Sequence, residues 1–249
     1  MTRRAQALAR LLAVQLLLFV REPYAVFFTL LFPLLLVVVL GSAFGRYEAD
    51  PGYRVSDENV PVLLATILAT LGVMGLPIVL AEYRSQGVLK RYRASPVTLG
   101  RLMTALLVAQ FAVFLVGGAL TAGLTWLLFG LRFSGNTAGV AVIAVVAAAA
   151  LFAFGVLVGG VVRSARTAQA VGFGTFFPML FLSGAMIPRG QLPEWLRRIG
   201  DFVPLTYAVD GLRLTWIGQA LTAQWPAVAV LTGMFVLAAA ASFRTFRWA

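Results

Sequence analysis

Cysteine and histidine are both absent from the 249 residues of this chain. Their absence excludes a disulfide framework, a zinc site built on thiolates, a cysteine nucleophile and a histidine general base. The chain also lacks a G-x-S-x-G sequence, the turn that carries the serine nucleophile of many hydrolases. We therefore expect the chain to have no catalytic residues and no metal site.

Charged residues are scarce as well. They make up 12% of the chain, against about 25% in soluble domains. Hydrophobic residues make up 61%, and the mean hydropathy is +0.92, so a water-soluble globular fold is excluded. The 20 Lys and Arg residues exceed the 9 Asp and Glu residues, giving a formal net charge of +11. In a soluble protein this excess would indicate a nucleic-acid surface, but in a membrane protein it indicates topology.

Six segments are long and apolar enough to cross a bilayer, which needs about 20 residues in a helix. None of the six contains Asp, Glu, Lys or Arg. A β-barrel would instead show short segments with alternating polarity, whereas runs such as 33–40 and 140–150 are apolar on all sides. The sequence predicts one all-α integral membrane domain over residues 1–249, with six transmembrane helices. The predicted helices are 24–44, 60–81, 102–129, 137–162, 167–187 and 225–243.

The loops between these segments differ in charge. One side of the predicted membrane holds 13 of the 20 basic residues and a net charge of +11, whereas the other holds seven basic and seven acidic residues. The positive-inside rule then places both termini in the cytoplasm. We expect the protein in the inner membrane of a bacterial cell. The excess charge thus marks topology and contact with lipid, and we expect no nucleic-acid partner. We expect Ser56 and Gln191 to be accessible from outside and Ser95 from inside.

Two stretches outside the six segments differ from ordinary loops. Residues 1–22 place leucines at spacings of three and four among arginines, which predicts an amphipathic helix on the cytoplasmic surface. Residues 188–224 contain short apolar pieces between Pro and Gly, which predicts a re-entrant outer hairpin between the fifth and sixth helices. Four aromatic residues there are expected at the level of the lipid headgroups. They are Trp195, Tyr207, Trp216 and Trp225.

The cytoplasmic loop 82–101 holds five of the inner basic residues. Charge alone would indicate contact with anionic lipid, at about 1 kcal/mol per residue. The order of the residues favours a role beyond contact with lipid. An acid and an arginine at the membrane are followed by a glycine, by a basic and aromatic helical turn, and by a stop at Ser95-Pro96. We interpret the loop as a short surface helix that contacts a partner. Its candidate contact residues are Glu82, Arg84, Gly87, Val88, Leu89, Lys90, Arg91, Tyr92, Arg93, Ser95 and Pro96.

These features together resemble the type-2 ABC exporter permeases, the daunorubicin-resistance-like family. In that family, a Glu-Arg-x-x-Gly stretch leads to a coupling helix that ends near Ala-Thr/Ser-Pro. Here the arginine comes one place later. Two further motifs occur in the family's order: an Arg-Asp/Glu-Pro start of the first helix, and a patterned segment between helices five and six. In this chain they read Arg21-Glu22-Pro23, then Leu182-Ser183-Gly184, Leu192-Pro193-Glu194-Trp195-Leu196 and Pro204 to Arg213.

The resemblance implies a complex of two permeases, either two copies or two related chains, with two ABC ATPase subunits. The chain contains no G-x-x-x-x-G-K-[ST] sequence, so ATP and Mg would be held by the partner ATPase and no cofactor by this chain. Movement of the ATPases would pass through loop 82–101 to helices one, two and five and switch the access of a cavity at the dimer interface. The outer hairpin would act as a gate. Its candidate residues are Pro193, Trp195, Pro204, Tyr207 and Asp210.

Two patterns in the apolar segments each have two interpretations. Gly155-x-x-x-Gly159 allows close helix approach, and packing within the subunit is favoured over a dimer face. Aromatic residues in the fifth segment are candidates for a translocation path, although most such residues face lipid or neighbouring helices. These candidates are Phe173, Phe176, Phe177, Met179 and Phe181.

The function favoured by the sequence is the membrane subunit of an ATP-driven exporter of an amphipathic drug, lipid or lipid-linked molecule. Export of a polysaccharide or lipid-linked glycan is an alternative within the same class. An ion-coupled secondary transporter is an alternative from another class, but it would need ionisable groups inside the membrane, and the six segments contain none. An intramembrane enzyme is disfavoured by the missing histidine.

Overall fold

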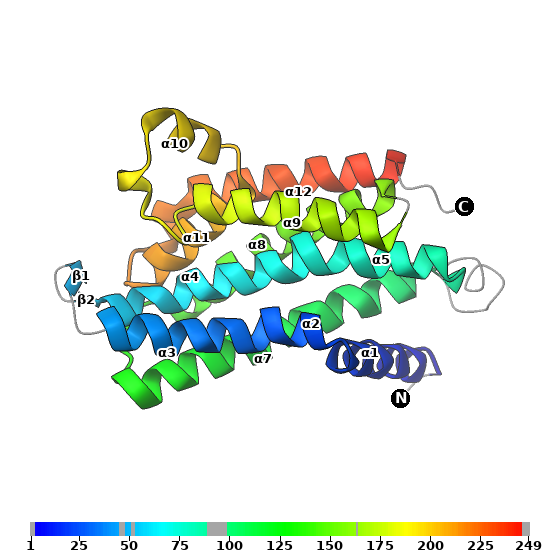
Figure 1. Ribbon diagram of the computed structural model, residues 1–249, viewed down its shortest axis with the longest axis horizontal. Coiled ribbons are helices and arrows are strands. Elements are labelled where there is room, and N and C mark those ends of the chain that lie inside the picture. The colour runs from blue at the N-terminus through cyan, green and yellow to red at the C-terminus, as the bar shows by residue number, and fades with distance from the viewer. Residues whose placement is uncertain (1–2, 45–47, 51–52, 89–98, 163, 246–249) are drawn as a thin grey trace.

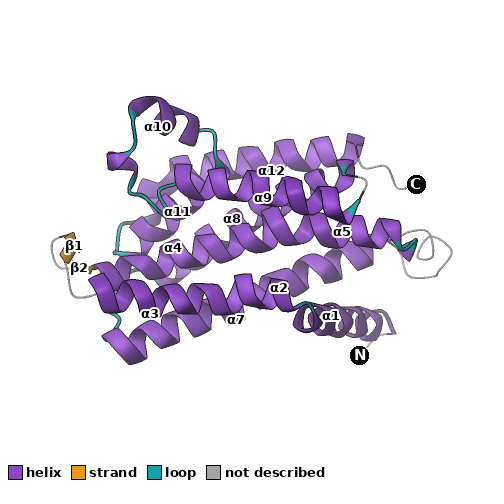
Figure 2. Cartoon of the chain, in the orientation of Figure 1, coloured by secondary structure: helices purple, strands orange, loops and turns teal. Residues whose placement is uncertain are grey.

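The computed structural model describes residues 3–44, 48–50, 53–88, 99–162 and 164–245. Over these residues the chain is a bundle of long helices lying roughly along one axis (Figures 1 and 2). A ribbon of two short strands, β1 (Glu48–Asp50) and β2 (Tyr53–Arg54), follows the first long helix. The strands pair antiparallel, with Glu48 opposite Arg54 and Asp50 opposite Tyr53. The sequence analysis did not predict this ribbon.

The long helices follow the predicted segments closely. Each of the first two is a continuous rod with a π-helical segment in its middle. The first rod consists of α2 (Pro23–Val26), η1 (Phe27–Leu31) and α3 (Phe32–Phe44), and the second of α4 (Val55–Ala69), η2 (Thr70–Gly75) and α5 (Leu76–Ser85). The others are α7 (Leu99–Phe129), α8 (Thr137–Val161), α9 (Ala165–Leu182) and α12 (Trp225–Thr245).

Five helices in the described part of the chain are long and apolar enough to cross a membrane, which confirms the prediction of an integral membrane helical protein. The remaining long helix, α9, does not meet that criterion because Arg166 and Gln169 make its first turns polar. It also ends at Leu182, five residues before the predicted boundary. Gly184, with φ +86°, and the Ser183 hydroxyl, which donates to the Leu180 carbonyl, stop it there.

The second rod is the centre of the bundle. Of its apolar stretch, 78% is buried inside the chain, against 22% for the first rod and 17% for the stretch that contains α12. It contacts α7, α8, α9 and the shorter helix α11 (Pro204–Trp216). The poorly buried outer helices present apolar side chains to their surroundings, as lipid-facing helices do.

The second rod extends beyond the predicted segment 60–81 at its start. It begins at Val55, five residues before the predicted start, and brings Asp57 and Glu58 into buried positions. The Asp57 carboxylate accepts hydrogen bonds from the backbone N–H groups of Arg54 (3.2 Å) and Arg132 (3.0 Å). Glu58 forms a 2.5 Å ion pair with Arg213. Ser56 lies buried beside them, so the expectation that it is accessible from outside is wrong.

The two π-helical segments share a position relative to proline. Segment η1 ends two residues before Pro33, and η2 ends two residues before Pro77. Proline donates no backbone hydrogen bond, and its ring crowds the carbonyl four residues earlier, here those of Thr29 and Val73. The wider π-turn accommodates this crowding, because Phe32 and Leu76 donate to carbonyls five residues back. Such segments occur frequently at functional sites.

Glycines bring α8 against the second rod. A methyl group on Gly155 would overlap the carbonyl oxygen of Gly72, and one on Gly159 would lie 2.9 Å from Leu80 Cδ1. The Gly155-x-x-x-Gly159 stripe therefore packs within the subunit, which confirms the favoured interpretation. Since the obstacle at Gly155 is backbone, no side chain can move aside to relieve it.

We expect Gly155→Ala to destabilise the protein by about 1–3 kcal/mol, because overpacking a close backbone contact forces the helices apart. Gly174→Ala in α9 is the matched control, since a methyl group there would meet no atom within 4 Å. Thermal unfolding of both variants in detergent, followed by size-exclusion chromatography, measures the difference. Equal melting temperatures would contradict the close packing of α8 on the second rod.

Candidate functional site

Both chain termini, the end of α5 and the start of α7 lie at one end of the bundle (Figure 1). We call this the termini end, and we call the opposite end, where β1, β2 and α10 (Glu194–Gly200) lie, the hairpin end. At the termini end, Arg84 joins α5 to the end of α8. Its Nη1 donates to the Val162 carbonyl (2.8 Å) and its Nη2 to the Gly160 carbonyl (3.1 Å). The last carbonyls of a helix lack partners inside the helix, so Arg84 satisfies two of them.

The predicted coupling segment begins where α5 ends. Gly87 adopts φ +68°, a conformation that favours glycine, and its N–H donates to the Arg84 carbonyl. Val88 is half-buried and packs against the core. The remaining candidate contact residues lie outside the described residues and stay predictions. They are Leu89, Lys90, Arg91, Tyr92, Arg93, Ser95 and Pro96.

The N-terminal helix α1 (Arg3–Arg21) is attached to the same end. The Tyr83 hydroxyl donates a 2.6 Å hydrogen bond to Gln15 Oε1, and α1 also packs against α7. Apolar side chains such as Leu17 and Val20 stay exposed on its other face. The helix ends at Arg21, as predicted from Glu22-Pro23. Its position on a membrane surface remains a prediction.

A cavity of about 580 Å³ lies between α1, the two rods, α7 and the first half of α9. This volume is within the range of about 300–1,000 Å³ that ligand pockets occupy. Both π-helical segments contribute to its wall, through Phe28 and Thr29 in η1 and through residues of η2 such as Met74 and Gly75.

Most of the cavity wall is apolar, but it carries polar groups in two places. Charged side chains line it towards the termini end: Glu22, Glu82 and Arg166. Thr29 and Gln110 line it within the bundle, where only 1% and 7% of their surfaces are exposed. The sequence analysis did not single out Thr29 or Gln110. The available signal was Gln110 itself, an isolated amide in an otherwise apolar segment, since polar groups inside a membrane are usually functional.

The five aromatic and methionine candidates for a translocation path do not share one face of α9. Phe173 lines the cavity and makes an edge contact with Phe28, with ring centroids 6.2 Å apart. Phe177 stacks on Phe173 at 5.9 Å and is exposed, as is Phe181. Phe176 and Met179 are buried in the core. Of the five, the structure therefore places only Phe173 at the cavity.

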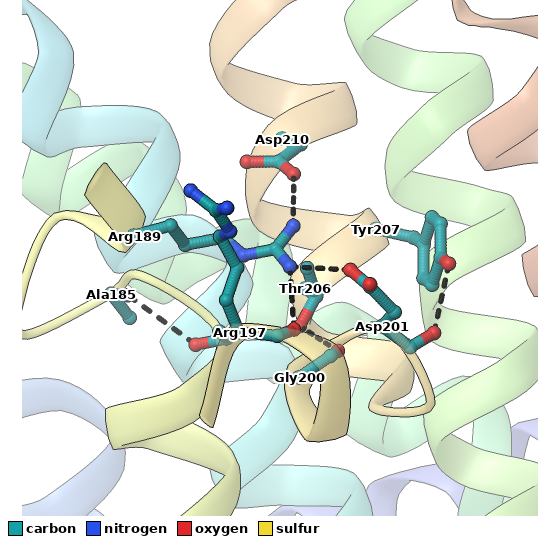
Figure 3. A network of polar contacts seen from close by, with 9 residues as sticks. Ala185, Arg189, Arg197, Gly200, Asp201, Thr206, Tyr207 and Asp210 are labelled. Carbon is teal, nitrogen blue, oxygen red and sulfur yellow. Dashed lines mark hydrogen bonds and ion pairs between the residues drawn. The ribbon is translucent and has the colours of Figure 1, made fainter. Parts of the chain in front are cut away.

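At the hairpin end, Arg189 holds the segment after α9 together (Figure 3). It lies in the short turn η3 (Arg189–Gln191). Its Nη2 contacts Asp201 Oδ1 at 2.5 Å and the Arg197 carbonyl at 3.0 Å, and its Nη1 lies 3.7 Å from Asp210 Oδ2. Burial raises the pKa of the Asp210 carboxyl, although Arg189 and Arg213 act in the opposite direction. The sequence analysis named Asp210 but not Arg189 or Asp201, because the residues of this network are distant in sequence.

The other gate candidates lie around this network. Tyr207 donates to the Asp201 carbonyl (2.8 Å), and Pro193 and Pro204 stand at the starts of α10 and α11. α11 is largely buried against α4 and α8, whereas Trp195 on α10 is exposed. A second short turn, η4 (Leu221–Gln224), leads from this region to α12.

Trp216 corrects one expectation about the aromatic residues of this region. Trp195 and Trp225 are exposed, as residues at the lipid headgroups would be, but Trp216 is buried. Its ring packs edge-on against Phe133 with a centroid distance of 4.7 Å. Since α11 faces the interior of the bundle, Trp216 contributes to the core.

Comparison with known proteins shows two kinds of similarity. Over 196 residues the chain is 29% identical to the "Probable multidrug ABC transporter permease YbhR" of Escherichia coli strain K12, and equally to that of strain O157:H7. This match covers 74% of the chain and 51% of YbhR, so the chain spans about half the length of these relatives. It is also 48% identical over 44 residues to "Nodulation protein J" of Rhizobium leguminosarum bv. viciae, which covers 18% of this chain and 17% of that protein.

The family model of the ABC-2 type transporters matches residues 6–217. The match extends from α1 through the cavity helices to the end of α11, so it includes both the cavity and the Arg189 network. The chain therefore belongs to the ABC-2 type transporter family.

Proposed function

We propose that this chain is the membrane subunit of an ATP-driven exporter that moves an amphipathic drug, lipid or lipid-linked molecule out of the cytoplasm. The observation that carries the proposal is the cavity of about 580 Å³, enclosed largely by membrane-crossing helices in a chain of the ABC-2 type transporter family. Its apolar wall with a few polar groups suits an amphipathic molecule better than a small ion.

The topology of the proposal has six crossings, with α9 as the fifth, and both termini in the cytoplasm of a bacterial cell. The termini end then faces the cytoplasm, and α10 and α11 form the outer re-entrant hairpin. In support, Figure 1 shows both termini at one end of the bundle, and α9 runs alongside the crossing helices. Its polar first turns, with Arg166 and Gln169, would lie at the cytoplasmic surface.

In this proposal energy comes from a separate ATPase subunit, which holds ATP and Mg and contacts residues 82–101. A second permease, either another copy or a related chain, completes the complex. Movement of the coupling segment reaches the cavity directly, because α5 continues into η2, whose residues line it. Arg84 carries the same movement to α8 through the Gly160 and Val162 carbonyls. The ATPase can shift the permease between two states only as far as its affinity for them differs.

Two substitutions test the coupling step. We expect Leu89→Asp and Tyr92→Asp to lower ATP-dependent transport at least about tenfold, because a desolvated carboxylate costs more than 1.4 kcal/mol at an apolar contact. ATP hydrolysis by the partner should persist without being coupled to transport. Proteoliposomes containing the permease and the ATPase that copurifies with it provide both measurements.

The matched control is Phe202→Asp, which introduces the same charge at an 81% exposed position of the hairpin end. Normal transport in the Leu89 and Tyr92 variants would contradict the coupling assignment. Transport driven by an ion gradient without ATP would instead support the ion-coupled alternative.

Single-cysteine labelling tests the topology. Because the chain contains no cysteine, only the introduced residue reacts with the label. In intact cells, Gln191→Cys on exposed η3 should react with a membrane-impermeant maleimide, and Ser95→Cys should react only after the membrane is opened. The reverse pattern would refute the proposed orientation. Ser56 is not a suitable outer position, because it is buried.

A further inference from the structure

The charged part of the cavity is unbalanced. Glu22, at the junction of α1 and α2, and Glu82, in α5, face one guanidinium, that of Arg166 in α9. Both carboxylates line this one cavity. Within the described residues neither carboxylate forms an ion pair with a Lys or Arg side chain. Each carboxylate attracts a positive charge, so a cation bound in this part of the cavity is favoured electrostatically.

The inner part of the cavity carries two groups that can form hydrogen bonds. Thr29 and Gln110 are more than nine-tenths buried and line the cavity, yet their side chains have no hydrogen-bond partner in the part of the chain that the structure describes. Gln110 Nε2 lies 3.8 Å from the position that a Cβ atom on Gly75 would occupy, which places the amide beside η2. A hydroxyl and an amide on the wall of a largely apolar cavity can exchange hydrogen bonds with an occupant, so these groups point to a ligand that carries a polar group.

Between these two polar regions the wall is apolar and aromatic. Phe28 and Phe173 stand opposite one another on η1 and α9, and Met74 and Ile78 of the central rod complete the surface. Tyr24 also lines the cavity near Glu22 in sequence. Aromatic rings bind apolar groups, and their faces attract organic cations.

We propose that the cavity binds an amphipathic organic cation that also carries a hydrogen-bonding group. The cationic head lies at Glu22 and Glu82, the apolar body lies against Phe28 and Phe173, and a carbonyl or hydroxyl group of the ligand bonds to Gln110 and Thr29. This inference rests on the proposed function, because it names the class of molecule that an exporter of this kind would carry. Because Arg166 could bind an anion instead, binding of an anionic ligand is the outcome that competes with this proposal.

Two dyes of similar shape and opposite charge test the proposal. Rhodamine 123 is a cation and fluorescein methyl ester is an anion above neutral pH, and both contain a xanthene ring and a methyl ester. Fluorescence anisotropy measures their binding to the full chain in lipid nanodiscs. Glu22 and Glu82 together exceed Arg166 by one negative charge. We therefore expect the cation to bind at least about tenfold more tightly than the anion.

Substitutions separate the two polar regions. Glu22→Gln and Glu82→Gln should each weaken binding of the cation about three- to tenfold and reduce the preference for it. Gln110→Leu should weaken the binding of both dyes to a similar extent, because both dyes carry the ester. The matched controls, Glu194→Gln and Gln191→Leu, lie at the hairpin end and should change neither affinity. Glu22 is exposed, so its substitution leaves the fold intact even if Glu82→Gln does not fold.

Equal affinity for the two dyes would overturn the inference, as would cation binding that Glu22→Gln leaves unchanged. A preference for the anion that Arg166→Gln abolishes would overturn it too and would assign the cavity to anionic ligands. These results are independent of the proposed function: ATP-dependent export with no preference for cations refutes only the inference. Cation binding without ATP-dependent export refutes only the proposed function.

Discussion

The constraint on which the whole structure depends is that backbone N–H and C=O groups inside a bilayer must find their partners within the protein. Long helices meet this demand along their length, and the problem remains at their ends and at prolines. The chain solves it with a few charged side chains. Arg84 donates hydrogen bonds to two carbonyls at the end of α8. Asp57, at the start of the second rod, accepts hydrogen bonds from two backbone N–H groups. At Pro33 and Pro77 it uses π-helical segments instead.

These local solutions place function on the central rod. One continuous helix carries Arg84 at its termini end, part of the cavity wall in its middle at η2, and Asp57 and Glu58 at its hairpin end. The glycines of α8 pack closely against the same rod, and the ion pair between Glu58 and Arg213 joins the rod to α11. A displacement of the rod would therefore change the cavity and the contact with α11 together. In the proposed function, this continuity would couple the movement of the ATPase to transport.

The sequence was sufficient to predict the helical membrane architecture, because uncharged runs of about 20 residues permit little else. It also indicated that Gly155 packs within the subunit. It ended the second helix at residue 81, however, four residues before the end of α5. The sequence failed at the hairpin end of the second rod, because hydropathy assigned Asp57 and Glu58 to a loop and could not anticipate partners as distant as Arg132 and Arg213. The cavity could not be predicted from the sequence either, because Glu22, Gln110 and Arg166 lie far apart in the chain and only folding brings them to one cavity.

The central claim is that a separate ATPase changes the access of the cavity through the second rod. The most direct test is the rate at which a thiol reagent modifies Ile78→Cys, a single cysteine at the cavity wall, in the purified complex of permease and ATPase. The account predicts that this rate changes several-fold when ATP binds, while the rate at Phe202→Cys, exposed at the hairpin end, stays constant. An Ile78→Cys rate that is the same with and without ATP would contradict it.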